Sequence, residues 1–188
     1  MTSEELLIKR AKNGDENAFA EIVKLYQNAV YNSALYIAKN QEDAFDISQE
    51  VFLKLWRTLN GFRGEASLKT WIAKITRNCA IDYVRARNQK SAASLDACED
   101  DKKTDIVDED PFANPQADYR RKEEAQAVRQ AVESLPSPTK EIIVLREFHD
   151  LSYGEIAKLL DIPEGTVKSR ISRGREQLKE ILKRGNFF

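Results

Sequence analysis

Histidine and cysteine are almost absent from this sequence of 188 residues. The two cysteines are too few for a disulfide framework. Neither of them is close in sequence to His149, the single histidine, so a Cys/His zinc site is not expected. A Ser/His catalytic pair would have to rest on that single histidine, which we interpret instead as an ordinary helix-end residue. Cys79 and Cys98 are interpreted as reduced thiols in the cytoplasm.

The sequence also lacks segments typical of export, membrane insertion and phosphate binding. Its N-terminus, MTSEELLIKRAKNGDENAF, is acidic at the start and has no apolar run of signal-peptide length. No stretch approaches the roughly 18 apolar residues of a membrane-spanning helix. Glycine-rich phosphate loops and metal-ligand spacings are missing beside the abundant Asp and Glu residues. We therefore expect a cytoplasmic protein that is not an enzyme and that holds neither a metal nor a cofactor.

The formal net charge of -1 conceals an uneven distribution of charge along the chain. Residues 63–90 carry seven basic and two acidic side chains, and residues 163–188 carry seven basic and three acidic ones. Residues 95–118, between these regions, carry nine acidic and two basic side chains. The two basic regions are compatible with nucleic-acid binding, which the total charge alone does not indicate.

Apolar residues recur at helical spacing through most of the chain, and no segment alternates convincingly in the manner of a β-strand. The predicted fold class is therefore all-α. The expected helices of the N-terminal half cover residues 4–13, 16–39, 41–59 and 67–88. In the C-terminal half we expect a helix from about residue 119 to the Leu-Pro-Ser-Pro break, one over residues 137–149, and two more after residue 151.

The helical spacing is lost between residues 91 and 118, where acidic residues accumulate. Pro111 and Pro115 are incompatible with a regular helix there, so we predict a flexible linker. The predicted organisation is two small helical domains, residues 1–90 and 119–188, joined by an acidic flexible linker over residues 91–118.

The segment LSYGEIAKLLDIPEGTVKSRI has the pattern of two short helices joined by a tight turn. Ser152 and Glu155 stand at the spacing of a capping box, and an apolar stripe follows them. Asp-Ile-Pro then turns the chain, and Pro163 presets the backbone at the start of a second, basic helix. This pattern predicts a helix-turn-helix whose second helix enters the major groove of DNA.

The second helix has an apolar side and a polar side. Val167, Ile171, Leu178 and Leu182 share the apolar side, and Gly174 at its margin would let another helix approach closely. An amphipathic helix with a solvated basic face would by itself show the same pattern, but the preceding turn favours DNA binding. The residues expected to face DNA bases or phosphates are Thr166, Lys168, Ser169, Arg170, Ser172, Arg173 and Arg175.

Two longer stretches resemble a known family. LPSPTKEIIVLREFHDLSYGEIAKLLDIPEGTVKSRISRGREQLKEIL resembles region 4 of bacterial RNA polymerase sigma factors, which reads the minus-35 promoter element. Response regulators end in a similar helix-turn-helix, so this stretch alone does not decide the family. DISQEVFLKLW and SLKTWIAKITRNCAIDYVR, in this order and spacing, resemble sigma region 2. Because the linker has no room for a folded region 3, the plan is similar to the extracytoplasmic-function (ECF) group of sigma factors.

The resemblance implies a sigma factor that binds core RNA polymerase, recognises the minus-10 and minus-35 elements and helps to open the promoter. The implied partners are promoter DNA, the clamp helices of the largest polymerase subunit, the flap of the second-largest subunit and an anti-sigma factor. The residues implied to bind core polymerase are Asp43, Asp46, Gln49 and Glu50, although a solvated helix face would show the same pattern. The residues implied to capture the minus-10 strand are Asn60, Phe62, Arg63, Thr70, Lys74, Arg77, Asn78 and Arg85.

The aromatic residues of the N-terminal half divide into two groups. Phe62, with Arg63 beside it on a glycine-flanked loop, suits stacking on unpaired bases. Four other aromatic residues, together with Leu55, are expected in the core rather than at a contact surface: Phe45, Phe52, Leu55, Trp56 and Trp71.

Asn78 is one helical turn from Asp82, so a structural hydrogen bond between them is an alternative to DNA contact.

Two other classes of protein remain as alternatives. A self-sufficient helix-turn-helix regulator would bind duplex DNA without polymerase, whereas a sigma factor would act through core polymerase. An enzyme with a DNA-binding tail would need a catalytic site, for which the sequence has no motif. Run-off transcription with purified core polymerase distinguishes the first alternative from a sigma factor.

Overall fold

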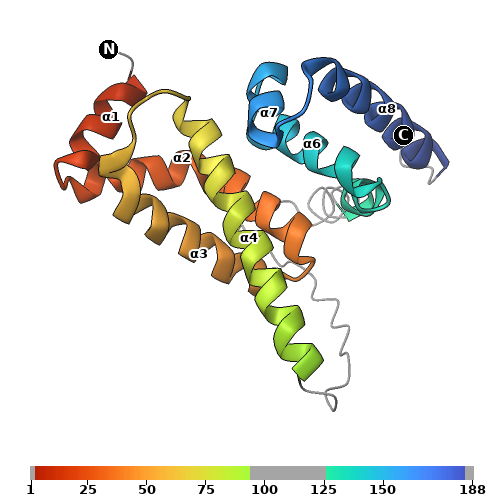
Figure 1. Cartoon of the computed structure of the whole chain (residues 1–188), viewed down its shortest axis with the longest axis horizontal. Helices are drawn as coiled ribbons and strands as arrows, with labels where there is room; N and C mark the ends of the chain where they lie inside the picture. The colour runs from red at the N-terminus through yellow and green to blue at the C-terminus, as the bar shows by residue number, and fades with distance from the viewer. Residues whose placement is uncertain (1–2, 94–125, 185–188) are drawn as a thin grey trace, which may run out of the picture. The chain divides into compact units, whose positions relative to one another are not determined.

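The computed structural model describes residues 3–93 and 126–184 of the chain. Every regular element among these residues is a helix, which confirms the predicted all-α class (Figure 1). The chain divides into two compact units, and residues 144–155 belong to the first of them. Residues 94–118 of the predicted linker, and Cys98 with them, lie outside the described residues.

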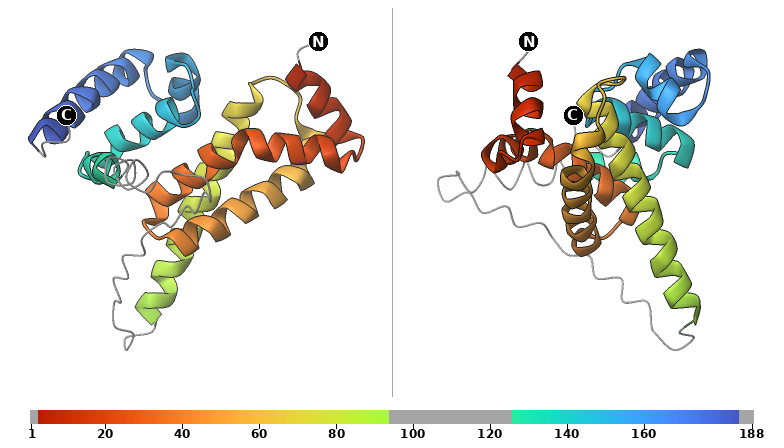
Figure 2. Two further views of the ribbon diagram at one scale, coloured as in Figure 1. Left: turned by 180° about the vertical axis from the view of Figure 1, so that it is seen from behind. Right: turned by 60° about the vertical axis from the view of Figure 1, so that its left-hand side comes forward.

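Among its described residues, the first unit contains four whole α-helices and a short 3-10 turn. They are α1 (Ser3–Lys12), α2 (Glu16–Ala38), α3 (Gln41–Thr58), η1 (Leu59–Gly61) and α4 (Leu68–Ala93). The C-terminal part of α4 extends beyond α2 and α3 in the views of Figures 1 and 2. This helix continues through Ala93 instead of ending near residue 88, because residues 89–93 contain neither proline nor glycine to stop it.

Side-chain caps begin three of these helices. The side chains of Asp15, Asn40 and Ser67 each accept a hydrogen bond from the backbone N–H three residues later, at 3.1, 3.1 and 3.3 Å. Asp15, Asn40 and Ser67 are therefore the N-caps of α2, α3 and α4. Gly14 has a φ of +86°, which turns the chain between α1 and α2 without the strain that a side chain would introduce.

The core of the first unit lies between α2, α3 and α4, and α1 adds Leu7 and Ala11 to it. Burial of each large aliphatic side chain contributes about 1.5–3 kcal/mol. Side chains at most 1% exposed in this core include Ile22, Val30, Ile47, Val51, Leu55, Leu68 and Ile72. Cys79 is a free thiol at its edge, and burial raises its pKa.

The second unit contains helical residues 126–133, most of α6 (Ser137–Glu147) and α7 (Tyr153–Leu160), and α8 (Glu164–Arg184). Within it α8 packs closely on α6. A Cβ atom on Gly174 would lie 2.7 Å from Thr139 Cγ2 and 3.2 Å from Ile143 Cγ1. This is the close helix approach predicted for Gly174. None of the helices in the described part of the chain is long and apolar enough to cross a membrane.

The environment of His149 differs from the expected one. His149 follows α6 but is only 3% exposed, with Nε2 lying 2.9 Å from Ser33 Oγ on α2. The neighbouring Phe148 ring lies 5.5 Å from the Tyr36 ring, centroid to centroid. Burial lowers the pKa of His149 to about 4. His149 is therefore a neutral, buried side chain of the first unit, and its interpretation as an ordinary helix-end residue is wrong.

Candidate functional site

The turn before α8 is built by backbone hydrogen bonds. Asp161 has a left-handed φ of 53°, and the Ile162 N–H donates to the Ala157 carbonyl at 3.0 Å. The Pro163 carbonyl accepts hydrogen bonds from the backbone N–H groups of Thr166 and Val167, at 2.9 and 3.2 Å. These bonds end α7 and begin α8 at the tight turn that the sequence predicts.

The capping box at the start of α7 is also present. The Ser152 N–H and Oγ each donate to Glu155 Oε2 at 2.8 Å, and the Glu155 N–H donates to Ser152 Oγ at 3.3 Å. Two donors at the helix start are thereby satisfied reciprocally, as the spacing of the two residues predicts.

The two sides of α8 separate as its sequence predicts. Val167 is 0% exposed and Ile171 is 2% exposed, whereas Leu178 and Leu182 are half-buried. The exposed members of the predicted DNA-contacting set are Lys168, Ser169, Ser172, Arg173 and Arg175, and the half-buried members are Thr166 and Arg170. The Ser169 hydroxyl donates to the Thr166 carbonyl at 3.0 Å, so this donor is already used within the helix.

The predicted polymerase-binding residues of α3 occupy two different environments. The Asp43 carboxylate accepts a hydrogen bond from the Tyr83 hydroxyl at 2.9 Å and pairs with Arg87, both on α4. Its side chain is only 15% exposed. Asp46, Gln49 and Glu50 are exposed. Asp43 therefore joins α3 to α4, and the other three side chains remain accessible.

The structure corrects the expected burial of the α3 aromatic residues. Leu55 is in the core at 0% exposed, but Phe45 is 57% exposed and Trp56 is 37% exposed. Residues 44, 47, 51 and 55 form the buried stripe. Because successive residues are about 100° apart around a helix, Phe45 and Trp56, each one position after a buried residue, point to a different side.

The exposed apolar residues of α3 border a shallow groove. The ring centroids of Trp56 and Phe19, on α2, lie 4.7 Å apart in an edge-on arrangement. The groove is lined by Glu16, Phe19, Gln49, Phe52, Leu53 and Trp56. We call the set Phe45, Asp46, Gln49, Glu50, Leu53 and Trp56 the α3 surface. A sequence signal for it existed, because α3 has two apolar stripes and only one can face the core.

The loop between α3 and α4 holds Phe62 against other side chains. The Phe62 ring is half-buried and packs on Trp71, with the centroids 5.0 Å apart and the planes 30° apart. Lys12, on α1, donates to the Phe62 carbonyl, and its Nζ lies 5.7 Å from the Phe62 ring centroid. Asn60 and Arg63, on either side, are exposed. Sequence reasoning missed Lys12, because 50 residues separate it from Phe62.

The remaining predicted minus-10 residues lie along α4. Lys74, Asn78 and Arg85 are exposed, whereas Thr70 and Arg77 are half-buried. Arg85 lies 3.9 Å from the Asp82 carboxylate. These side chains come from successive turns of one helix, so α4 can present them together with the loop that precedes it.

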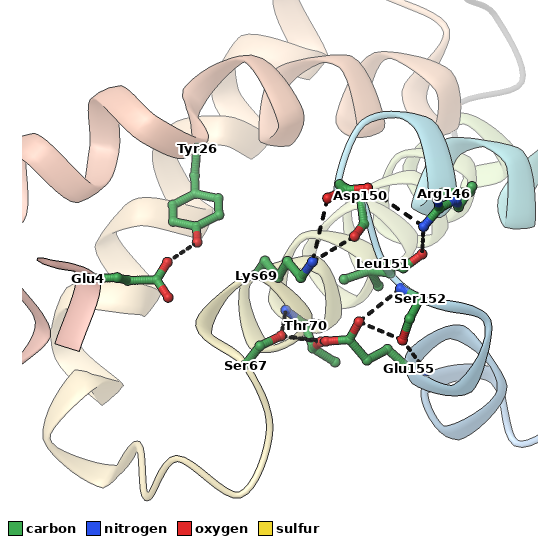
Figure 3. A network of polar contacts seen from close by, with 10 residues as sticks. All are labelled: Glu4, Tyr26, Ser67, Lys69, Thr70, Arg146, Asp150, Leu151, Ser152 and Glu155. Carbon is green, nitrogen blue, oxygen red and sulfur yellow. Dashed lines mark hydrogen bonds and ion pairs between the residues drawn. The ribbon is translucent and has the colours of Figure 1, made fainter. Parts of the chain in front are cut away.

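Thr70 also takes part in a polar network of the first unit (Figure 3). The hydroxyls of Ser67 and Thr70 donate to Glu155 Oε1 at 2.6 and 2.7 Å. Partial burial of Glu155 opposes its ionisation, but the hydrogen bonds from Ser67, Ser152 and Thr70 outweigh this effect and lower its pKa to about 2. Lys69 donates to the Asp150 carbonyl at 2.7 Å beside them. Glu155 is therefore ionised at neutral pH.

Two segments of the chain match known protein families. Residues 22–90 match sigma-70 region 2, and residues 125–178 match sigma-70 region 4. The chain is 35% identical over 178 residues to the ECF RNA polymerase sigma-E factor of Escherichia coli (strain K12), covering 94% of this chain and 92% of that protein. It is 32% identical over 180 residues to the RNA polymerase sigma-H factor of Pseudomonas aeruginosa, with the same coverage of 94% and 92%.

Two solved structures share the fold. The sigma factor RpoE of Bartonella quintana, solved with the anti-sigma factor NepR, is 24% identical and has a TM-score of 0.68, covering 88% of this chain and 96% of that one. CnrH, solved with the cytosolic domain of CnrY, is 21% identical and has a TM-score of 0.65, covering 97% and 98%.

Proposed function

The chain belongs to the extracytoplasmic-function sigma factors, and we propose how its surfaces divide the work of such a factor. As a sigma factor it directs promoter-specific transcription initiation when bound to RNA polymerase. We assign residues 1–90 to region 2, residues 91–118, of which the first three still belong to α4, to a linker, and residues 119–188 to region 4. Sigma factors are initiation factors, and we propose that this chain has no catalytic activity of its own.

The exposed face of α8 reads the minus-35 element in this proposal. Val167 and Ile171 are buried, so they fix which side of the helix faces outward. Arg173 on the exposed side can donate to guanine in the major groove, and Lys168 and Arg175 can bind phosphates. This separation of a buried from a basic face on the second helix of a helix-turn-helix is the observation that carries the proposal.

The loop after α3 and the exposed side of α4 capture the minus-10 strand. The Arg63 guanidinium is exposed and can stack on an unpaired base, and Lys74 and Arg85 supply positive charge along the same strand. Thr70, Arg77 and Asn78 complete the surface. Binding the unpaired strand more tightly than the duplex shifts the melting equilibrium, so opening needs no catalytic group.

The α3 surface binds core polymerase. Its exposed aromatic and aliphatic residues lie beside Asp46 and Glu50, and large exposed apolar side chains among charged ones are typical of protein interfaces. We propose that the clamp helices of the largest subunit contact this surface and that region 4 contacts the flap of the second-largest subunit. The RpoE structure contains an anti-sigma factor, and we propose such a partner here, in the cytoplasm.

Run-off transcription with purified core polymerase tests this function. We expect a promoter-specific transcript only when the protein and core are both present, together with association between the two. Tight, specific binding of duplex DNA by the protein alone, with no association with core, would instead support a self-sufficient regulator. That outcome would contradict the proposal that the protein acts through core polymerase.

A further inference from the structure

We propose that Lys12 is a positioning residue for promoter opening, because it holds Phe62 and thereby fixes the loop of residues 60–67. The inference rests on the proposed minus-10 role of this loop. Lys12 lies on α1, outside residues 22–90 that match region 2, so the family match assigns it no role.

Lys12 is itself held in place by the corner between α1 and α2. It is the last residue of α1, two residues before Gly14 with its φ of +86°. In the same corner, two guanidinium nitrogens of Arg10 lie 2.8 and 2.7 Å from Asp15 Oδ2. Asp15 also caps α2. The backbone on either side of Lys12 is therefore held by contacts within the corner between α1 and α2.

Phe62 attaches the first part of the loop to the fold, and Ser67 caps α4 at the other end. The Phe62 backbone N–H donates to the Leu59 carbonyl at 3.0 Å, and its own carbonyl accepts a hydrogen bond from the Lys12 ammonium. Its ring packs on Trp71 at 5.0 Å and has the Lys12 ammonium 5.7 Å from its centroid. A charged donor over an aromatic face adds a cation–π attraction to the hydrogen bond. Phe62 is thus joined to η1, α1 and α4 at once.

These contacts give Phe62 a different role from the one that its sequence suggests. A ring already in contact with Trp71 and Lys12 serves as an anchor, whereas the exposed Arg63 remains available for an unpaired base. A loop fixed before DNA arrives loses less conformational entropy on binding, which favours strand capture. Lys12 therefore promotes opening through Phe62, without contact with DNA.

The test compares Lys12→Met with Lys9→Met in holoenzyme assembled from purified core. Both changes remove one positive charge from α1, but Lys9 is exposed and lies one helical turn away from the anchoring position. Opening is followed by the fluorescence of 2-aminopurine placed in the minus-10 element. Because a hydrogen bond to a charged group is lost, we expect Lys12→Met to reduce open complexes about tenfold. Closed-complex formation and affinity for core are expected to stay unchanged.

Two further variants test the route of the effect. Lys12→Arg keeps the charge and the donors, so it should restore most of the opening. In a Phe62→Leu background, Lys12→Met should have a smaller effect than in wild type, because the ring contact with Lys12 is already lost while the hydrogen bond to the carbonyl of residue 62 remains. Faster hydrogen exchange of residues 60–67 in free Lys12→Met, but not in free Lys9→Met, is expected as well.

The possible outcomes separate this inference from the function on which it rests. If wild-type holoenzyme gives no promoter-specific opening, the proposed function fails. If wild type opens promoters but Lys12→Met matches Lys9→Met, or its effect adds fully to that of Phe62→Leu, the positioning role of Lys12 is overturned alone. Equal losses in core binding and opening would show a folding defect, and would also overturn it.

Discussion

Replacing Gly174 by alanine tests the packing that presents the DNA-contacting face of α8. The added Cβ would meet Thr139 Cγ2 at 2.7 Å and two carbon atoms of Ile143 at 3.2 and 3.3 Å. The nearest atom belongs to a β-branched side chain with few rotamers, so relief requires a shift of α6 or α8. Forced overpacking costs about 1–3 kcal/mol, and alanine recovers about 1 kcal/mol of helix propensity.

The net expectation for Gly174→Ala is a loss of about 1 kcal/mol in the free energy of unfolding of the second unit. Gly165 supplies the matched control on the same helix, because its Cβ would meet nothing within 4 Å. Gly165→Ala is therefore expected to be neutral or stabilising. The double variant Gly174→Ala, Thr139→Ser removes the methyl group that the new Cβ meets, and should recover most of the lost stability.

Urea unfolding followed by circular dichroism, with hydrogen exchange of α6 and α8, measures these differences. In holoenzyme, Gly174→Ala should also weaken use of the minus-35 element, because the exposed face of α8 would shift. A Gly174→Ala protein as stable as Gly165→Ala, or a double variant less stable than the sum of its single changes, would refute the close approach of α6 and α8.

Three other changes test separate surfaces. Arg173→Ala should reduce transcription from promoters that depend on the minus-35 element about tenfold; an equal loss on a template lacking that element would contradict base reading. Trp56→Ala should weaken binding to core polymerase without unfolding the protein, because the Trp56 side chain is 37% exposed. The control Leu55→Ala changes a side chain that is 0% exposed and should lower the free energy of unfolding by about 2–5 kcal/mol. If Trp56→Ala bound core as tightly as wild type, Trp56 would be excluded from the interface. The pKa of Glu155 is lowered from 4.5 to about 2, so its stabilisation of the first unit is present above pH 4.5 and lost as pH falls towards 2. Allowing for solvent screening, Glu155→Gln should remove about 1 kcal/mol at pH 7 and flatten the acid limb of the stability curve; an unchanged acid limb in urea titrations would contradict the network.

Much of the secondary structure and part of the candidate site were predictable from local spacing. Asp15, Ser67 and the Ser152–Glu155 pair cap their helices by hydrogen bonds that span three residues. The buried and exposed sides of α8 follow from its helical period in the same way. These interactions involve neighbours along the chain, so the sequence specifies them before any tertiary contact forms.

The α3 aromatic residues show where such reasoning stops. Two apolar stripes run along this helix, and the periodicity of the sequence does not decide which of them meets α2 and α4. The structure buries Leu55 and exposes Phe45 and Trp56, so the expectation of burial was wrong for both aromatic residues. The choice depends on the shapes of the partner helices, which the sequence of α3 does not contain.

The helical class, the capping residues and the helix-turn-helix pattern follow from residues a few positions apart, and the family resemblance follows from the order and spacing of longer stretches. The folded structure was needed to show that Asp43 pairs with α4, that His149 is buried beside Ser33, and that Lys12 contacts Phe62. These partners are 44, 116 and 50 residues apart. Their contacts form only after the packed helices have brought distant parts of the chain together, so no local sequence pattern predicts them.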